Sequence, residues 1–481
     1  MGDGCNDGSC GCGNDRLRDG PFNRDDDSFH PMGSDWEAEM RERLEETEYD
    51  ADLGMEMARD AQQLVAGELS EEEFHSKYHE AVIEEFEVDD RPTAEVFEDA
   101  GVDPSKGLEE ALESFEGDED QSRREVMKKM GLGAAAVGLG GMATRENDAA
   151  PAEPEVAATG HDADEGINYG MVIDLERCDG CLQCVVGCMN ENQWASGANW
   201  MYVLTYEDEN AEDENFLVRP CQHCNNAPCD KVCPVNARHT RDKDGLVLTD
   251  YETCIGCRYC QVACPYGVNY FGWYDPAEED EKADWDEIGQ VDYSPRELRA
   301  MSDGERQDVL MDSGDHLHDE RGHWVDSRPP KGVMGKCTMC PSRQDGNMGE
   351  EAVGTVACMD SCDQAGMSAI HFGDMNDPES RPRQYLQRRE DVQPTSEELA
   401  EQMEGDEEWV DPREPDDRQK MSAFRLLEDM GTEPSIVYIG NEPSENAEQV
   451  EGPVSYEALQ GTTDRGKDTL DEWTVGITGG D

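Results

Sequence analysis

The sequence predicts an α+β fold of two cysteine-bearing lobes with insertions, preceded by a small acidic helical module. Sixteen of the 19 cysteines fall into four sets, at residues 178–188, 221–233, 254–264 and 337–362. Short apolar segments such as Gly245–Thr249 favour strands that pack against short helices following the cysteine loops. Upstream of the sets, an acidic stretch carries apolar residues at a helical spacing. The chain is therefore expected to begin with helices and to continue as a cysteine-rich α+β domain.

Residues 1–120 are predicted to form an acidic extension that contains the helical module. The apolar residues spaced four apart are Phe74, Tyr78, Val82 and Phe86. Ser70 and Glu73, just before this run, form a capping-box pattern that marks the start of a helix. His75 and His79 lie one turn apart and could hold a metal ion. On so acidic a helix, however, a solvated face is the favoured interpretation.

Three further cysteines, Cys5, Cys10 and Cys12, lie among glycines and aspartates near the beginning of the sequence. No fourth ligand stands near them, as a closed metal site would require. Free thiols in a tail are the expected state.

Residues 121–165 resemble a twin-arginine export signal followed by a linker. Arg123 and Arg124 precede an uncharged run from Met130 to Thr144, and an Ala-Pro-Ala sequence at 150–152 offers a cleavage site. A chance arginine pair in a linker is the alternative. We expect export by this route and a place on the outer face of the cell membrane as part of a complex, the cytoplasmic face being the alternative. The run is too short and too glycine-rich to span a bilayer, so membrane contact is expected through a partner only.

The spacing within the four cysteine sets is typical of iron–sulfur ligands. The sets are Cys178-x2-Cys181-x2-Cys184-x3-Cys188, Cys221-x2-Cys224-x4-Cys229-x3-Cys233, Cys254-x2-Cys257-x2-Cys260-x3-Cys264 and Cys337-x2-Cys340-x17-Cys358-x3-Cys362. A tight loop can place three such thiolates on three corners of one cubane. In two-cluster ferredoxins the cysteine after x3 binds the other cluster, so the sets work in pairs. Four sets therefore predict four [4Fe–4S] clusters with these sixteen cysteines as the iron ligands.

Structural zinc is the main alternative, because Cys-x2-Cys pairs also recur in zinc ribbons. Zinc requires neither the third cysteine nor the cysteine-proline endings that Pro234 and Pro265 complete. Disulfides are less favoured still, since cysteines at this repeated spacing are poorly placed to pair.

The charge of the chain indicates its setting. With 114 acidic and 40 basic residues, the formal net charge is −74 over 481 residues. So large a charge strains a compact fold unless molar salt screens it within roughly 3 Å. The composition therefore predicts a protein of a salt-loving organism and disfavours nucleic-acid binding. Acidic disorder is the alternative for parts of the chain, but the cysteine sets oppose it for the middle.

From residue 169 to about 375 the chain closely resembles the four-cluster electron-transfer subunits of respiratory molybdopterin oxidoreductases, which include polysulfide, tetrathionate and dimethyl sulfoxide reductases. The segments that carry the resemblance are Met171–Asp174, Arg219–Cys224, Cys254–Gly267 and Lys336–Cys340, with Gly431–Tyr438 similar to the family's C-terminal tail. The resemblance implies two bacterial-ferredoxin-like lobes within residues 166–375, each with two [4Fe–4S] clusters. It leaves an acidic insertion at about 275–328 and an acidic C-terminal tail at 376–481.

The resemblance also implies how the sets combine, the first with the fourth and the second with the third. The implied ligand groups are Cys178, Cys181, Cys184 with Cys362; Cys337, Cys340, Cys358 with Cys188; Cys221, Cys224, Cys229 with Cys264; and Cys254, Cys257, Cys260 with Cys233. Nitrate-reductase relatives replace one cysteine of the third set by tryptophan and hold a three-iron cluster there. This chain keeps that cysteine, so four [4Fe–4S] centres are implied. Asp363, where the family often has proline, should lower the potential of its cluster if it stays ionised and poorly solvated.

A row of one-electron carriers transfers electrons and makes no bonds. The resemblance therefore implies an electron-transfer subunit without a substrate site of its own. The implied partners are a molybdopterin-containing catalytic subunit, near the cluster of Cys178, and a quinone-reactive membrane-anchor subunit, facing the cluster of Cys337. The alternatives are the beta subunit of a formate dehydrogenase or hydrogenase, and an assembly or binding protein in which the clusters are structural.

Overall fold

The computed structural model describes residues 28–31, 33–91, 166–194, 199–208, 215–273, 293–389, 392–403, 421–443, 447–450 and 452–453. The N-terminal cysteines, the twin-arginine segment and its linker lie outside the described residues. No helix within the described ranges combines the length and the apolar character that a membrane span needs.

Among the described residues, three helices precede the cysteine region: α1 (Ser34–Glu45), α2 (Ala51–Val65) and α3 (Glu71–Phe86). The capping box expected at the start of α3 is present, with the Ser70 side chain accepting from the Glu73 N–H and the Glu73 carboxylate accepting from the Ser70 N–H. The side of α3 that carries Phe74, Tyr78 and Val82 is buried.

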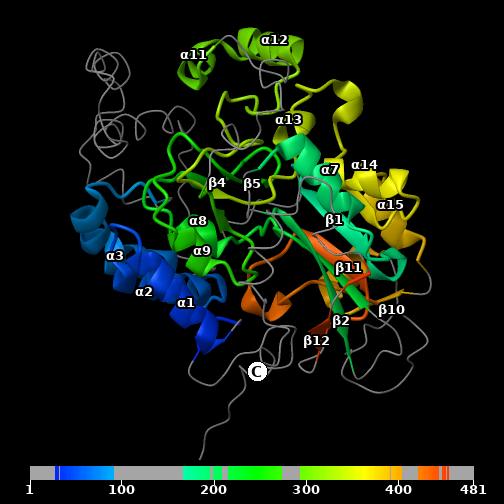
Figure 1. Cartoon of the computed structure of the whole chain (residues 1–481), viewed down its shortest axis with the longest axis horizontal. Helices are drawn as coiled ribbons and strands as arrows, with labels where there is room; N and C mark the ends of the chain where they lie inside the picture. The colour runs from blue at the N-terminus through cyan, green and yellow to red at the C-terminus, as the bar shows by residue number, and fades with distance from the viewer. Residues whose placement is uncertain are drawn as a thin grey trace, which may run out of the picture.

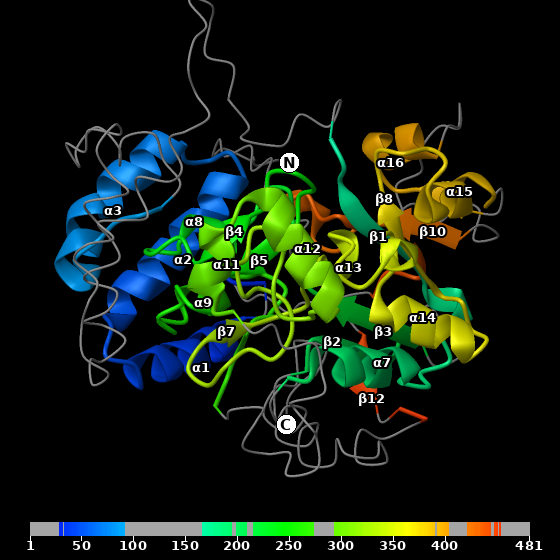
Figure 2. The same cartoon turned by 90° about the horizontal axis from the view of Figure 1, so that it is seen from above.

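These three helices cover the part of the chain that holds the second and third cysteine sets (Figures 1 and 2). Helix α2 lies against α8 (Pro228–Lys231) and α9 (Tyr259–Ala263). The contact is close at Gly54, where a Cβ atom would lie 2.6 Å from Cε1 of Tyr259. The Tyr259 hydroxyl donates a 2.6 Å hydrogen bond to the Asp50 carbonyl. The helical module is thus fixed to the cysteine region by side-chain and backbone contacts.

In the described ranges the largest sheet has five strands, in the order β8 (Ile370–Asp374), β1 (Tyr169–Asp174), β11 (Ile436–Gly440), β10 (Met421–Phe424) and β9 (Val392–Pro394). Strand β1 is buried along its whole length. It pairs with β11 in parallel, with Met171 opposite Ile436, and with β8 antiparallel, with Met171 opposite Phe372. Central strands buried on both faces read as near-continuous apolar runs, as Met171–Ile173 does.

The sheet corrects one expectation from the sequence. An acidic tail was expected from residue 376, whereas strands β9, β10 and β11 of the central sheet lie beyond that position. The strands form there because short apolar runs such as Ile436–Gly440 find a buried partner in β1.

Smaller sheets and short helices complete the cysteine region. The sheets are β12 (Glu448–Val450), β2 (Met201–Glu207), β3 (Asn215–Pro220); β4 (Arg238–Thr240), β5 (Val247–Thr249); and β6 (Tyr270–Phe271), β7 (Met334–Gly335). The remaining helices are η3 (Leu175–Arg177), α7 (Gln183–Asn192), α11 (Pro295–Ala300), α12 (Asp303–Ser313), α13 (Pro341–Gln344), η4 (Glu350–Ala352), α14 (Ala357–Gln364), α15 (Arg381–Gln387), α16 (Glu397–Gln402) and η5 (Glu428–Met430).

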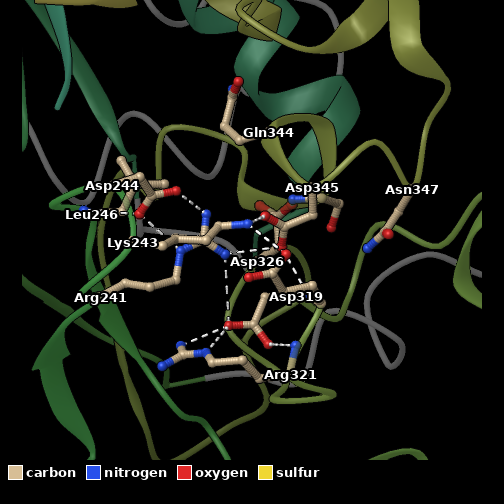
Figure 3. A network of polar contacts seen from close by, with 12 residues as sticks. Arg241, Lys243, Asp244, Leu246, Asp319, Arg321, Asp326, Gln344, Asp345 and Asn347 are labelled. Atoms are coloured by element: carbon tan, nitrogen blue, oxygen red, sulfur yellow. Dashed lines mark hydrogen bonds and ion pairs between the residues drawn. The ribbon is translucent and has the colours of Figure 1, made fainter. Parts of the chain in front are cut away.

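A buried polar network fastens the described part of the acidic insertion to the cysteine region (Figure 3). Arg241, in the turn between β4 and β5, pairs with Asp244 in the same turn, and its Nη1 lies 2.9 Å from Asp345 after α13 and 3.8 Å from Asp319 of the insertion. The side chain of Arg241 is 2% exposed and the three carboxylates are fully buried. One guanidinium thus contacts carboxylates from three segments, and Lys243 and Arg321 supply further positive charge to Asp345 and Asp319.

Candidate iron–sulfur site

The four loops that open the cysteine sets share one backbone feature. In each set the residue directly before the second cysteine has a positive φ, and these residues are Gly180 (69°), His223 (43°), Gly256 (72°) and Met339 (58°). A left-handed residue at this point turns the chain sharply, so the flanking thiols can face one side of the loop. Two of the four are not glycine, and strain of this kind persists only where the surroundings hold it.

His223 is held in its strained conformation by two hydrogen bonds. The Val247 N–H donates to Nδ1 at 3.1 Å, so Nε2 carries the proton and donates to the Cys337 carbonyl at 2.9 Å. Burial, with the Lys336 ammonium next in effect, lowers the pKa of His223 well below its ordinary value. The neutral ring therefore joins the second set to the fourth.

The last two cysteines of each set lie one helical turn apart, on or just beyond a short helix. These pairs are Cys184 and Cys188 on α7, Cys229 and Cys233 at α8, Cys260 and Cys264 at α9, and Cys358 and Cys362 on α14. Helices α7 and α14 approach closely, since a Cβ atom at Gly187 would lie 1.9 Å from the Ser361 hydroxyl. Helix α8 lies against α9 in the same way.

The thiols gather into four groups, each with three cysteines of one set and one cysteine of another. Apart from burial, the groups that most raise the pKa of Cys188 are the thiols of Cys337, Cys358 and Cys340. Cys178, Cys181, Cys224, Cys233 and Cys257 are likewise affected most by cysteines of their own group, whereas Cys184 and Cys337 are affected most by a cysteine of a neighbouring group. The groups are A (Cys178, Cys181, Cys184, Cys362), B (Cys188, Cys337, Cys340, Cys358), C (Cys221, Cys224, Cys229, Cys264) and D (Cys233, Cys254, Cys257, Cys260).

The contacts between groups run in a single order. Cys184 of group A is next to Cys358 of group B, and Cys337 of group B is next to Cys221 of group C. Group C in turn approaches group D. In the row A–B–C–D, group B lies inside the row and group D at its end.

The residues fit iron–sulfur clusters. All sixteen cysteines are free thiols, and only Cys178 and Cys181 are partly exposed. Burial raises the pKa of Cys264 to about 11 and that of Cys233 to about 12, so these sites favour thiolate only when a cation binds them. The cysteines that follow x3 also receive N–H donors, among them Ala369 N–H to Cys362 Sγ (3.2 Å), Arg238 N–H to Cys233 Sγ (3.3 Å) and Asn192 Nδ2 to Cys188 Sγ (3.3 Å). Hydrogen bonds to sulfur are a usual means of tuning such clusters.

Asp363 is ionised but well compensated. Both of its oxygens accept from Arg381, at 2.7 and 2.8 Å, and these bonds hold its pKa below the ordinary value. The carboxylate is also 33% exposed. The condition for a strong lowering of the cluster potential, a poorly solvated lone charge, is therefore not met.

The His75 side chain is buried, and the His79 side chain, 22% exposed, lies 2.9 Å from Asp89, so the expectation of a solvated face is wrong. With Asp89 they offer three potential metal ligands within 4.8 Å of one another, and the His75 side chain is 3% exposed. Arg91, however, donates to both Asp89 oxygens at 2.6 Å. The arrangement favours a buried ion-pair cluster over a metal site.

Buried basic side chains lie beside the thiols and were not predicted from the sequence. Lys336 is 1% exposed and donates to the Cys337 carbonyl at 2.8 Å, while Arg238, also 1% exposed, lies beside Cys260. Their nearness to cysteines in the sequence was visible, but basic residues are almost never fully buried unless paired. That prior favours solvent exposure.

Two family models match parts of the chain. The model described as the N-terminal region of 4Fe-4S ferredoxin iron-sulfur binding matches residues 30–94, which include the three N-terminal helices. The model described as a 4Fe-4S dicluster domain matches residues 213–280, which hold the second and third cysteine sets. The fold is thus a mixture of helices and strands with ferredoxin-type domains, and the protein binds multiple [4Fe–4S] clusters.

Several curated proteins are similar over most of their length. A putative iron-sulfur subunit of a dimethyl sulfoxide reductase from Halobacterium salinarum is 30% identical over 292 residues, which are 58% of this chain and 80% of that protein. An arsenate respiratory reductase iron-sulfur subunit of a Shewanella species is 33% identical over 47% of this chain and 90% of its own. The iron-sulfur cluster-binding subunit of a menaquinone reductase of Nitratidesulfovibrio vulgaris is 29% identical over 57% and 89%, respectively.

Proposed function

Since the chain belongs to the family of iron–sulfur subunits of dimethyl sulfoxide reductase-type respiratory complexes, we propose that it relays electrons through four [4Fe–4S] clusters between a molybdopterin-containing catalytic subunit and a quinone-reactive membrane subunit. The clusters supply reversible one-electron transfer, and the sixteen cysteines of groups A to D hold them. The chain itself then needs no substrate site.

The observation that carries the proposal is the continuous order of the four cysteine groups. Each x3 cysteine lies with three cysteines of another set, which is the ligand exchange of two-cluster ferredoxins. This supports two lobes, one with groups A and B and one with groups C and D. Electrons could then pass from one end of the chain to the other without leaving it.

The ends of the row suggest where the two partners bind. Group A includes the partly exposed Cys178 and Cys181, and family analogy assigns this end to the catalytic subunit. Group D lies at the other end, beneath the N-terminal helices, where Tyr259 donates to Asp50. We propose that this end receives electrons from the quinone-reactive partner. The menaquinone-reductase relative supports a quinone-linked complex of this kind.

Reversible reduction of the purified chain tests the proposal against an assembly or binding role. Anaerobic protein titrated with dithionite should take up about four electrons per chain, one for each cluster, and return them to an added oxidant without loss of iron. Visible absorption and EPR follow the reaction. Clusters that cannot be cycled would favour the structural alternative.

We propose further that the segment around Arg123 and Arg124 exports the folded protein to the outer face of the membrane. Replacing both arginines by lysine keeps the charge but removes the arginine pair of the signal, so the protein should accumulate in the cytoplasm. Cell fractionation with immunodetection measures the distribution, and Lys128 and Lys129 replaced by arginine serve as the control. Unchanged export of the double-lysine variant would make the arginine pair incidental.

A further inference from the structure

Arg238 is a buried cation without a carboxylate partner. It is 1% exposed and is the first residue of β4. Within the described ranges, no ion pair includes it, and its Nε and Nη1 atoms have no hydrogen-bond partner. A buried, unpaired charge is costly. Such a group persists where something of opposite charge faces it.

The groups that face Arg238 are cysteines of two different groups. Its Nη2 lies 3.8 Å from Sγ of Cys260, and its backbone N–H donates to Sγ of Cys233 at 3.3 Å, both in group D. Burial acts to lower its pKa, but the charges of Cys260, Cys229, Cys221 and Cys254 outweigh burial and raise it. Cys229 and Cys221 belong to group C. The guanidinium therefore contacts group D, and its charge also reaches Cys229 and Cys221 of group C.

Arg241, three residues further on, shows what a structural arginine looks like in this region. Its nitrogens are occupied by Asp244 and Asp345, with Asp319 close by (Figure 3). Both side chains are buried, but Arg241 is neutralised by protein carboxylates and Arg238 by none of the described ones. The difference indicates that the charge of Arg238 is left for a bound group.

We propose that Arg238 is a positioning residue that raises the reduction potentials of the two clusters held by groups C and D, by presenting its fixed positive charge to both. The inference rests on the proposed function. A [4Fe–4S] core with four thiolates is anionic and becomes more so when an electron enters. A buried cation therefore stabilises the reduced state of each neighbour, and potentials depend on local charge and hydrogen bonds to sulfur. Groups C and D form the end of the row that is proposed to lie nearer the quinone-reactive partner. Higher potentials of their clusters favour the entry of electrons from that partner.

EPR-monitored redox titration of the purified, iron-loaded full chain tests this. Arg238→Met keeps the backbone N–H to Cys233 and removes the guanidinium, with its charge and its side-chain donor to Cys260. It should lower the midpoint potentials of two of the four clusters by at least about 59 mV. For one electron, this is a tenfold change in the equilibrium constant of reduction. The other two clusters should keep their potentials, and the iron content should stay unchanged. Arg238→Lys, which retains the charge, should restore most of the shift.

Lys231→Met is the matched control, because it removes one positive charge from α8, between Cys229 and Cys233. The Lys231 side chain is 14% exposed and already paired with a carboxylate, Glu71 at 3.3 Å, so its loss should leave all four potentials nearly unchanged. Equal shifts of the midpoint potentials in Arg238→Met and Lys231→Met would mean that only the net charge of the protein matters, and this result would overturn the inference. So would an Arg238→Met protein with full iron and wild-type potentials.

Should Arg238→Met lose iron, Arg238→Gln, which keeps a hydrogen-bond donor without the charge, replaces it in the titration. The same lowering is expected, and wild-type potentials would overturn the inference. A wild-type chain without redox-active clusters would instead refute the proposed function itself.

Discussion

Replacing Cys188 by serine is expected to damage the same cluster as replacing Cys337, although Cys188 stands in the first cysteine set. The side chain of Cys188 lies with Cys337, Cys340 and Cys358 of the fourth set. A serine oxygen is a harder and poorer ligand for iron than a thiolate, so the cluster of group B should shift in potential or fall to a three-iron form. Low-temperature EPR of the two variants should show the same signal perturbed.

Cys184→Ser is the matched control, because Cys184 lies one turn from Cys188 on the same helix, α7. It belongs to group A, so its replacement should perturb the signal that Cys178→Ser perturbs and leave the group B signal intact. Since the row is in series, the Cys188 variant should also slow quinol-dependent turnover of the assembled complex. Turnover measured with a donor that reduces the catalytic subunit directly should be unchanged. A Cys188 variant that matches Cys178→Ser would mean that each set binds its own cluster.

Arg241→Met is expected to cost the fold about 3–5 kcal/mol, since it leaves buried carboxylates without their shared cation. Asp244, Asp319 and Asp345 all lie against this guanidinium and are fully buried. The insertion should loosen from the β4–β5 turn, because Asp319 loses one of its cations. Denaturant unfolding of the anaerobic protein, followed by the visible absorption of the clusters, measures the change.

Lys243→Met provides the comparison. Lys243 contacts the same Asp345, at 2.7 Å, but its side chain is 37% exposed, so its removal should cost less than about 1 kcal/mol.

The pH dependence of unfolding provides a second test of the network. Burial acts to raise the pKa of Asp319, but Arg321, His323 and Arg241 outweigh it and hold the pKa below its ordinary value. The wild type should therefore lose this stabilisation as the pH falls through that lowered pKa. The stability of the Arg241→Met variant should depend less on acid pH, because part of this stabilisation is already gone. Equal losses of unfolding free energy in Arg241→Met and Lys243→Met would contradict the role given to Arg241.

The features that the sequence predicted well are local ones. The capping box of Ser70 and Glu73 depends on four consecutive residues, and the short helices after the cysteine loops follow directly from the cysteine spacing. The sharp turn before the second cysteine of a set could be predicted in the two sets where a glycine, Gly180 or Gly256, precedes that cysteine. At His223 and Met339 it could not be, because tertiary contacts rather than residue type hold the positive φ there.

The features that it missed depend on contacts between distant parts of the chain. Strand β11 pairs with β1 from the other end of the domain, so a segment interpreted as an acidic tail became the centre of a sheet. His75 and His79 turn toward Asp89 beyond the end of their helix, where helical periodicity carries no information. The order A–B–C–D needed the approach of Cys337 to Cys221, which spacing alone cannot supply.

The most direct test of the account is the iron and acid-labile sulfide content of the anaerobically purified chain. Sixteen cysteines in four groups predict about sixteen irons and about sixteen sulfides per chain, as four [4Fe–4S] clusters. Iron near four per chain, or stoichiometric zinc in its place, would contradict the account.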